Sequence, residues 1–379
     1  MIYADNAATT KLDIEAFEIM KPFLLEEYGN ASQPYFFSKK AKMALKNARK
    51  KIARCINAEP EEIYFTSGGT ESDNWVIKNF GLSTDIRRII TSEIEHHAVL
   101  NACKHMEEVG VTLTYLPVTN TGIVKSETLE NCFEKEDAPV ASCETTLVSI
   151  MLANNEIGTI QDIKELSDIA HKHGAYFHTD AVQAVGHIPI DVKDLGVDFL
   201  SASAHKFNGP KGIGFLYVRN GSLLQPLNDG GAQEKGMRAG TENVAAIVGM
   251  AVALEKNIIH MNDNASRLSA FEDLLEKQLL DQGVSFIRNG DVNHVPGNMS
   301  LSFINQDGEM LLHRLDLMKI CVSTGSACDS INTQISHVLK AIHLDESIAE
   351  GTIRISLGKN NSKEEVTAIA KAIAKIINS

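Results

Sequence analysis

Ala175-Tyr-Phe-His-Thr-Asp180 is a short, mostly apolar run that ends at an acid, and similar runs recur between residues 60 and 220. The candidate strands are Ile63–Thr66, Arg88–Thr91, Thr112–Val118, Leu147–Ala153, Ala175–Asp180, Phe199–Ser203 and Gly212–Arg219. Helical stretches lie between them, such as Asp162–His173, which is followed by Gly174 as helix C-termini often are. This alternation predicts an α/β fold, with a mostly parallel sheet covered by helices on both faces.

The pattern changes after Thr241. A long helical tract is predicted from Asn243 to about Leu280, and the last helix opens on Ser362-Lys-Glu-Glu365, a capping-box pattern. Between them we expect Met299–Ile304 (strand), Gly308–Ile320 (helix), Cys321–Ser323 (short strand) and Ile353–Leu357 (strand). Because 379 residues are too many for one ordinary core, we predict a large domain over residues 13–256 and a small α+β domain from residues 1–12 and 257–379.

Composition and charge narrow the function. Hydrophobic residues make up 44% of the chain, as in globular proteins, and the net charge is 36 − 49 = −13. This charge repels nucleic acids and anionic membranes, so neither is expected as a direct partner. The basic run from Lys39 to Arg54 is the exception, and its helical spacing is typical of a solvated helix face.

Cysteine use points to a reducing compartment. The chain has no CxxC and no Cys/His group with structural-zinc spacing, so no metal site of its own is expected. The N-terminus lacks a charged-then-apolar leader, and no apolar run reaches about 18 residues. These features predict a cytoplasmic protein whose cysteines are free thiols.

A lysine follows Asp180 by 26 residues, in Ser203-Ala-His205-Lys206. Most Asp and Lys pairs are solvated surface charges, but this acid ends a predicted buried strand and this lysine lies among Ser, His and Gly. Pyridoxal phosphate (PLP) chemistry needs both groups, because an amine holds the aldehyde and a carboxylate keeps the pyridine nitrogen protonated. The pair therefore predicts a PLP site.

Three further segments suit the same coenzyme, and each has a plainer alternative. Thr66-Ser-Gly-Gly-Thr70 follows a strand and opens a helix, which favours a phosphate, although ordinary strand–helix turns look alike. His96 follows a strand and could stack on a flat ring, or be a surface or core-edge histidine. The glycine-dense loop 230–243 could present Thr241 to an anion, or be a plain flexible loop.

A cysteine and an arginine in the C-terminal third are candidates for substrate chemistry. Cys328, in Ser326-Ala-Cys328-Asp, has almost nothing apolar around it, so we expect an exposed, mobile nucleophile, whereas Cys321 is assigned to the core. Arg354 alternates with Ile353 and Ile355 and is expected to face away from the buried side of its strand. A guanidinium suits a carboxylate, and an ordinary exposed strand arginine is the alternative.

Nine segments, in order and nearly end to end, resemble the NifS-like cysteine desulfurases of the class V aminotransferase family. They are Asp5-Asn-Ala-Ala-Thr-Thr, Tyr28-Gly-Asn, Thr66-Ser-Gly-Gly-Thr-Glu-Ser-Asp-Asn, Glu95-His96, Asn154-Asn155-Glu-Ile-Gly, Asp180-Ala-Val-Gln183, Ser203-Ala-His-Lys206, Arg238-Ala-Gly-Thr241 and Ser326-Ala-Cys328. The resemblance implies a PLP-dependent transferase of fold type I. Such a protein has a large domain with a mainly parallel seven-stranded sheet, a small α+β domain, and usually a homodimeric assembly with the active site at the interface.

The same resemblance assigns roles around the coenzyme ring. Lys206 would bond to the aldehyde and later move the substrate Cα proton, and Asp180 would pair with the ring nitrogen. Gln183 would hydrogen-bond the phenolic oxygen, while His96 would stack on the ring and assist proton transfer.

Further residues would hold the phosphate and the substrate. Gly69, Thr70, Ser203 and His205 would bind the phosphate, with Thr241 reaching in from the other subunit. Nearer the substrate, Asn155 would contact the coenzyme and, with Arg354, the carboxylate of L-cysteine.

Cys328 would attack the substrate sulfur, giving alanine and an enzyme persulfide for a protein or small-molecule acceptor. The acceptor could serve iron–sulfur cluster assembly, tRNA thiolation or a specialised pathway, and Cys328 could ligate a metal cluster in an acceptor complex.

The chain departs from the family pattern in three places. Tyr35 stands where a histidine is common, which affects contacts at the active-site entrance. Asp329 follows Cys328 and should raise the pKa of its thiol. The sequence ends at Ser379 without the family's C-terminal extension, so a different or more dedicated acceptor is expected.

Two other functions fit the same motifs. A selenocysteine lyase or other class V enzyme would not depend on Cys328 for ordinary turnover. A non-catalytic PLP-fold binding protein need not keep a lysine bonded to the coenzyme.

Overall fold

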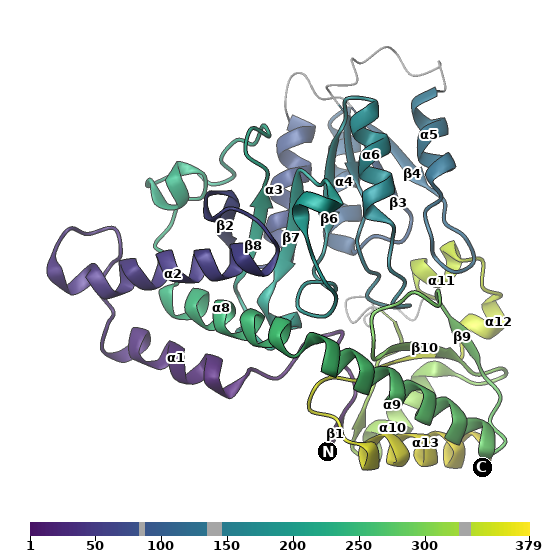
Figure 1. Ribbon diagram of the computed structural model, residues 1–379. Coiled ribbons are helices and arrows are strands. Elements are labelled where there is room, and N and C mark those ends of the chain that lie inside the picture. Colours follow the sequence, from purple (N-terminus) through teal and green to yellow (C-terminus); the bar gives the residue numbers. More distant parts are fainter. Residues whose placement is uncertain (83–87, 135–145, 326–334) are drawn as a thin grey trace.

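The computed structural model describes residues 1–82, 88–134, 146–325 and 335–379 (Figure 1). Its centre is a seven-stranded sheet of order β2-β8-β7-β6-β5-β3-β4. Only β8 runs antiparallel to its neighbours in this sheet, so the predicted mainly parallel α/β architecture is confirmed. The strands are β2 (Ile63–Thr66), β3 (Arg88–Ser92), β4 (Thr112–Leu116), β5 (Thr146–Ser149), β6 (Tyr176–Asp180), β7 (Phe199–Ser203) and β8 (Gly214–Val218).

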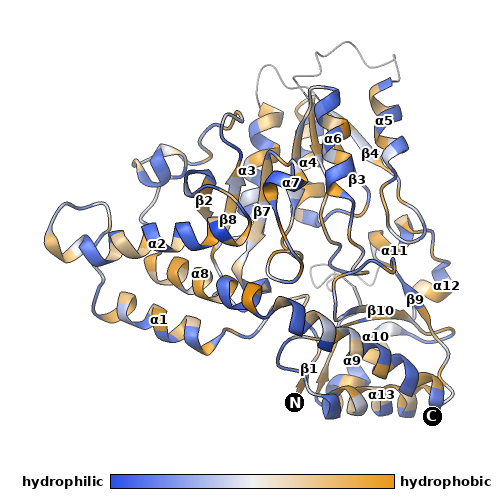
Figure 2. Cartoon of the chain, viewed as in Figure 1, coloured by the Kyte–Doolittle hydropathy of each residue, from blue (hydrophilic) through white to orange (hydrophobic). Residues whose placement is uncertain are grey.

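Alternate side chains of this sheet enter two hydrophobic clusters. Ile89, Leu147 and Phe199 join one cluster together with residues of α3 (Gly69–Leu82) and α4 (His97–Glu108). Their neighbours in sequence, Ile90, Val148 and Leu200, join the other cluster with α6 (Ile163–Lys172) and α8 (Val244–Ile259). The period of two along a strand therefore buries both faces. Figure 2 shows the strands mainly in hydrophobic colours, whereas α6 shows both hydrophobic and hydrophilic ones.

Two helices near the N-terminus, α1 (Ile14–Leu25) and α2 (Lys39–Cys55), pack against α8 and project from the body (Figure 1). The basic side chains of α2 lie mostly on its outer side, while Leu45 and Ile52 are buried, as predicted for a solvated helix face. The remaining short helices of this part are α5 (Ser126–Glu134) and α7 (Val192–Leu195).

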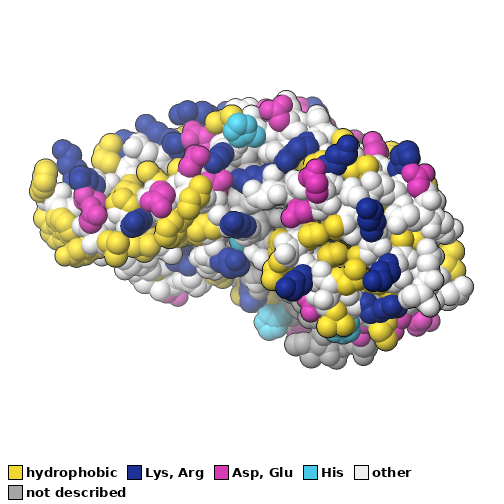
Figure 3. All heavy atoms as spheres, turned by 90° about the horizontal axis from the view of Figure 1, so that it is seen from below, with side chains coloured by type: hydrophobic (Ala, Val, Ile, Leu, Met, Phe, Trp, Pro, Cys, Tyr) yellow, Lys and Arg dark blue, Asp and Glu magenta, His cyan; other side chains and the backbone are white. Residues whose placement is uncertain are grey.

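Large hydrophobic side chains are exposed along α1, the following loop and the start of α2. We call this surface the α1–α2 patch, and Figure 3 shows hydrophobic atoms gathered over this projecting part. Phe36 is 88% exposed and Tyr28 71%, which is unusual for side chains of this size. The patch comprises Ile14, Phe17, Ile19, Leu24, Leu25, Tyr28, Tyr35, Phe36, Phe37 and Met43.

A third hydrophobic cluster lies in the C-terminal part of the chain. It is built on an antiparallel sheet of β9 (Ile287–Asn289), β10 (Asn298–Ser302) and β12 (Thr352–Ser356), and Ala4 from the N-terminal segment joins it. The other elements here are β1 (Ile2–Tyr3), β11 (Ile320–Cys321), α9 (Met261–Asp281), α10 (Gly308–Leu317), α11 (His337–Ala341), α12 (Glu346–Ala349) and α13 (Lys363–Ile377). The predicted capping box of Ser362 and Glu365 does open α13.

The helical tract predicted from Asn243 to Leu280 is two helices, with a bend of 68° between α8 and α9. The reason is packing, because Met250 and Leu254 of α8 join the large central cluster, whereas Leu268 and Leu275 of α9 join the C-terminal one. Within the described residues, no individual helix is long and hydrophobic enough to cross a membrane. Only when α8 and α9 are taken together do length and composition reach what a membrane span needs, and the two are bent relative to each other.

One smaller expectation was wrong, and a second one was incomplete. Cys321 is half-buried rather than in the core, since β11 is a two-residue strand whose partner in its sheet is the equally short β1. Arg354 faces away from the cluster that holds Ile353 and Ile355, but it is only 2% exposed. The N-terminal segment covers that second face, where Asp5 pairs with the arginine.

Candidate active site

The carboxyl ends of β6 and β7 bring the predicted pair to one cavity. Asp180 ends β6, and Lys206 closes a single helical turn directly after β7, its parallel neighbour. Both side chains line a cavity of about 490 Å³. The other predicted site residues that line this cavity are Gly69, Thr70, His96, Asn155, Gln183, Ser203, His205 and Arg354.

Lys206 is held by backbone carbonyls of the N-terminal segment. Its Nζ donates to Ala7 O at 2.5 Å and to Ala8 O at 2.9 Å. On the backbone side, His187 Nε2 lies 2.9 Å from Lys206 O. Burial lowers the pKa of His187, so this imidazole is neutral at neutral pH and donates to the carbonyl. Both the amine and the backbone of Lys206 are therefore held by hydrogen bonds.

Asp180 is 5% exposed, and burial raises the pKa of its carboxyl to about 6. The Val182 N–H, which donates to Oδ1 at 2.9 Å, and the nearby charge of Lys206 oppose that rise. Gln183, from the same turn, donates to Ala7 O at 2.9 Å. An ionised Asp180 is therefore best stabilised when a second cation, such as a protonated ring nitrogen, comes to lie beside it.

The N-terminus of α3 faces the cavity at Gly69 and Thr70. A Cβ on Gly69 would come within 2.5 Å of Val182 Cγ2, so only glycine lets the helix start this close to β6 and β7. His205 also lines the cavity, with Nδ1 3.1 Å from Thr9 Oγ1. Burial, together with the charges of Lys206 and Lys211, lowers the pKa of His205 to about 4. Helix N–H groups, hydroxyls and a neutral imidazole thus form a cradle for a phosphate.

His96 caps α4, and its Nδ1 accepts from Ala98 N at 3.1 Å. Arg354, another residue of the cavity lining, binds Asp5 Oδ1 at 2.7 Å and Asn155 O at 3.0 Å through its two terminal nitrogens. Its buried Nε has no hydrogen-bond partner among the described residues. Arg354 lines the cavity, and a guanidinium is well suited to bind a carboxylate.

Two sequence-predicted features lie elsewhere, and the position of a third is not described. Thr241 is exposed and is not part of the cavity wall within this chain. Tyr35 is 50% exposed in the α1–α2 patch rather than at the cavity. Cys328 and its neighbour Asp329 fall outside the described residues.

Sequence reasoning missed a buried acid in the cavity wall. Asp73, on α3, is 1% exposed, and its Oδ1 has no hydrogen-bond partner in the described part of the chain. Burial and the charge of Asp180 raise its pKa well above the ordinary value. A polar residue in the first turns of a helix looks like any solvated one, so only its position within the 66–74 motif could have pointed to it. The carbonyls of Ala7 and Ala8 were missed for a simpler reason, since backbone atoms carry no residue signature.

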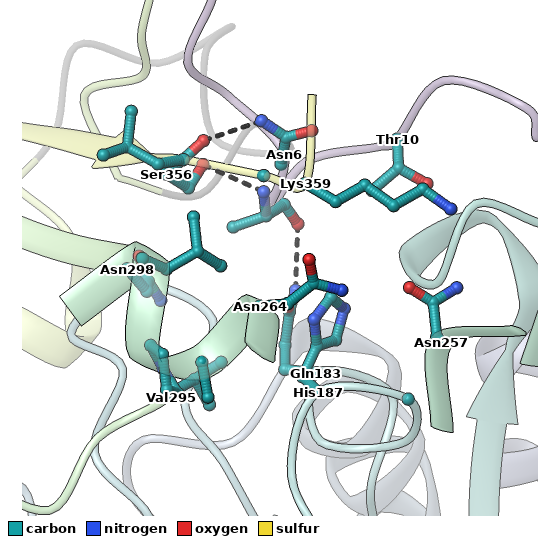
Figure 4. Close-up of a pocket in the computed structure, with 18 of the residues that line it drawn as sticks. Asn6, Thr10, Gln183, His187, Asn257, Asn264, Val295, Asn298, Ser356 and Lys359 are labelled. Atoms are coloured by element: carbon teal, nitrogen blue, oxygen red, sulfur yellow. Dashed lines mark hydrogen bonds between the residues drawn. The ribbon is translucent and has the colours of Figure 1, made fainter. Parts of the chain in front are cut away.

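A second, smaller cavity of about 50 Å³ lies behind Gln183 (Figure 4). Polar side chains from both parts of the molecule surround it, among them Asn6, His187, Asn257 and Asn298. Asn6 donates to Ser356 O at 2.9 Å, and Gln183 reaches Ala7 O from the other side. This cavity is too small for a coenzyme, and its hydrogen bonds tie the N-terminal segment to β12.

PLP fits the larger cavity on three structural grounds. The N–H groups at the start of α3 line the cavity and suit a phosphate, the buried carboxyl of Asp180 suits a cationic ring nitrogen, and the amine of Lys206 lies on the same cavity, where it can bond to an aldehyde. The fold and this donor set define the class: a PLP enzyme of fold type I.

Comparison with known proteins agrees. The model of the class V aminotransferase family matches residues 2–369. The chain is 48% identical to the cysteine desulfurase IscS of Dictyoglomus turgidum, over 99% of this chain and 94% of that protein. Among solved structures, a NifS-like protein aligns over 100% of this chain and 99% of its own, with 38% identity and a TM-score of 0.91. The structure of SspA in complex with cysteine covers 94% of this chain and 99% of its own, with 36% identity and a TM-score of 0.81. The chain therefore belongs to the class V aminotransferase family, in its NifS-like cysteine desulfurase group.

Proposed function

We propose that this protein is a PLP-dependent cysteine desulfurase that converts L-cysteine to L-alanine and passes the sulfur to Cys328. The observation that carries the proposal is the meeting of Lys206, Asp180, the α3 N-terminus and Arg354 on one cavity. An amine, a buried acid, a phosphate cradle and a carboxylate-binding arginine are what the coenzyme and an amino acid need together. The names of the full-length relatives support the same activity.

PLP, when bound, supplies an electron sink for the charge left at the substrate Cα. The chain's own residues do the rest. Lys206 Nζ moves the Cα proton, Asp180 keeps a positive charge on the ring nitrogen, and Arg354 with Asn155 orients the substrate carboxylate. His205, neutral above pH of about 4, donates a hydrogen bond to the phosphate without adding charge.

Sulfur transfer falls to Cys328. Its thiolate forms an S–S bond to the substrate sulfur while the substrate Cβ–Sγ bond breaks and its electron pair goes to Cβ, which takes a proton and becomes the methyl group of alanine. The chain leaves toward residue 328 from beside the cavity, since Ser323 exchanges backbone hydrogen bonds with Arg354 at 3.1 and 2.6 Å. A persulfide on this segment would then be offered to an acceptor.

The assembly we propose is a homodimer, with the α1–α2 patch as part of the interface. A monomer seldom leaves so many large apolar side chains in water. In each subunit the exposed Thr241 comes three residues before α8, and α8 packs against α1 and α2. If the patches of two copies meet, Thr241 of one copy therefore comes near α1 and α2 of the other. Free thiols at Cys55, Cys103 and Cys321 suit a reducing compartment, in keeping with a cytoplasmic location.

The test is turnover of L-cysteine by the protein loaded with PLP. Alanine and sulfide should form in equal amounts with a reductant, and Cys328→Ser should abolish sulfide release, while Cys321→Ser, a cysteine outside the cavity wall, should not. Undiminished turnover by Cys328→Ser would favour a selenocysteine lyase or another class V activity. A protein that, like Lys206→Ala, lacks the absorbance band of PLP bonded to a lysine would instead point to a non-catalytic relative.

A further inference from the structure

A second buried carboxyl group accompanies Asp180 in the cavity wall. His178 and Asp180 are two residues apart on β6, so their side chains share one face of the sheet. Asp73 Oδ1 lies 3.6 Å from His178 Nε2, and Asp73 lines the same cavity as Asp180. Asp73 therefore lies close to Asp180, the acid that would pair with the ring nitrogen of PLP.

The surroundings of the two acids differ. Asp180 receives the Val182 N–H and has Lys206 close enough to favour its charged form. The histidine beside Asp73 brings no such charge, because burial lowers the pKa of His178 to about 3. Both ring nitrogens of His178 are engaged with hydroxyls, at 2.8 Å from Ser149 Oγ and 3.0 Å from Ser201 Oγ.

The other groups that act on Asp73 are Glu95, a further buried acid whose charge would repel it, and Ser201, whose hydroxyl favours the anion through a hydrogen bond. Full burial and the negative charge of Asp180 outweigh this one hydroxyl and leave the protonated form of Asp73 favoured, and any ionisation of Glu95 would favour it further. When two buried carboxyl groups lie close together in unlike surroundings, one stays protonated and the other is ionised.

We propose that Asp73 is a positioning residue that carries the proton of the Asp73–Asp180 pair, so that Asp180 alone is the anion facing the ring nitrogen of PLP. The inference rests on the proposed function, since it supposes that PLP occupies the cavity. Ionisation of Asp73 at alkaline pH then places a second negative charge beside the ring nitrogen and changes the electronic state of the bound coenzyme.

Infrared difference spectra of the holoenzyme locate the proton. Wild type minus Asp73→Asn should contain the carbonyl stretch of a protonated carboxylic acid at pH 7. Glu95→Gln serves as the matched control, because it removes its own buried acid and should leave the band of Asp73 in place. A difference spectrum that contains only carboxylate bands for residue 73 would overturn the proposal.

The nitrogen-15 resonance of labelled PLP in the same proteins tests the consequence. Wild type and Asp73→Asn should give the same ring-nitrogen resonance at pH 7, and the two should separate at the alkaline pH where the acid band disappears. A difference already present at pH 7 would mean an ionised Asp73 or a merely structural effect, and no separation at any pH would mean that Asp73 does not act on the ring. Failure of the wild type to bind PLP would refute the proposed function instead, so the two failures are distinguishable.

Discussion

Arg354 is the residue whose environment is least like that of an ordinary strand arginine. It is buried, two of its nitrogens are committed to Asp5 and Asn155, and Nε is left over. We expect Arg354→Lys to raise KM for L-cysteine by about 10- to 100-fold, because a lysine cannot keep these contacts and also bind a carboxylate. Steady-state kinetics check this, with Arg288→Lys, whose partners are Glu272 and Glu276, as the control. An unchanged KM would remove Arg354 from the substrate site.

The buried carboxyl group of Glu95 leads to a prediction about how the stability of the fold depends on pH. Burial raises its pKa to about 8, so folding favours the protonated acid. The stability that this group contributes is complete below its ordinary pKa of 4.5 and is lost as pH rises through 8. Glu95→Gln should therefore lose less stability than wild type between pH 5 and pH 9, with a difference of about 2–4 kcal/mol in the free energy of unfolding. Denaturant titrations at both pH values measure it, and Glu93→Gln, at an exposed acid two residues away, should follow wild type.

At the scale of single residues, the sequence was enough to predict charged side chains in places where charges are unusual. It did not reveal residues whose role depends on neighbours that only the fold brings close. Lys206 and Asp180 stood out because charged groups seldom follow apolar strands so closely. Asp73 did not, because its burial arises only when β6 and β7 pack over α3. Arg354 was found, but its burial by Asp5 needed a contact between residues 349 apart.

Elements were more predictable than contacts, because most strands of the large sheet are compact apolar runs buried on both faces, which leaves a sequence signature. The edge strand β4, with Thr112 and Tyr115 exposed, is the exception. The break between α8 and α9 was missed because no Gly or Pro marks the junction at His260, and only the separate hydrophobic clusters that the two helices join impose the bend. The domain boundary at residue 256 stays a prediction, close to that break.

At the scale of the elements, the prediction concerns the N-terminus of α3 and its role in binding PLP. A methyl group at residue 69 would meet Val182 at 2.5 Å, so Gly69→Ala must push the helix N-terminus away from the phosphate cradle. We expect its affinity for PLP to fall by about tenfold or more, on the scale of 1–3 kcal/mol for overpacking. Fluorescence titration of the apoprotein with PLP measures it. Gly81→Ala, in the same helix, meets only the flexible Met106 side chain and should keep wild-type affinity, so equal losses in both variants would contradict the prediction.

At the scale of the whole molecule, the exposed apolar side chains of the α1–α2 patch favour a partner, and the proposed partner is a second copy of the chain. Stable interfaces bury about 1,200–2,000 Å² around a hydrophobic centre, and the patch supplies Leu25 and Phe36 at 65% and 88% exposure. Sedimentation at micromolar concentration should give a dimer for wild type and a monomer for Leu25→Glu/Phe36→Glu, because two charges per subunit would be buried against apolar surface. Leu317→Glu, at an 84% exposed leucine on α10, is the matched control and should remain a dimer. The monomeric variant should also bind PLP more weakly, since Thr241 of the partner would no longer complete the phosphate cradle. A double variant that still sediments as a dimer would place the interface on another surface.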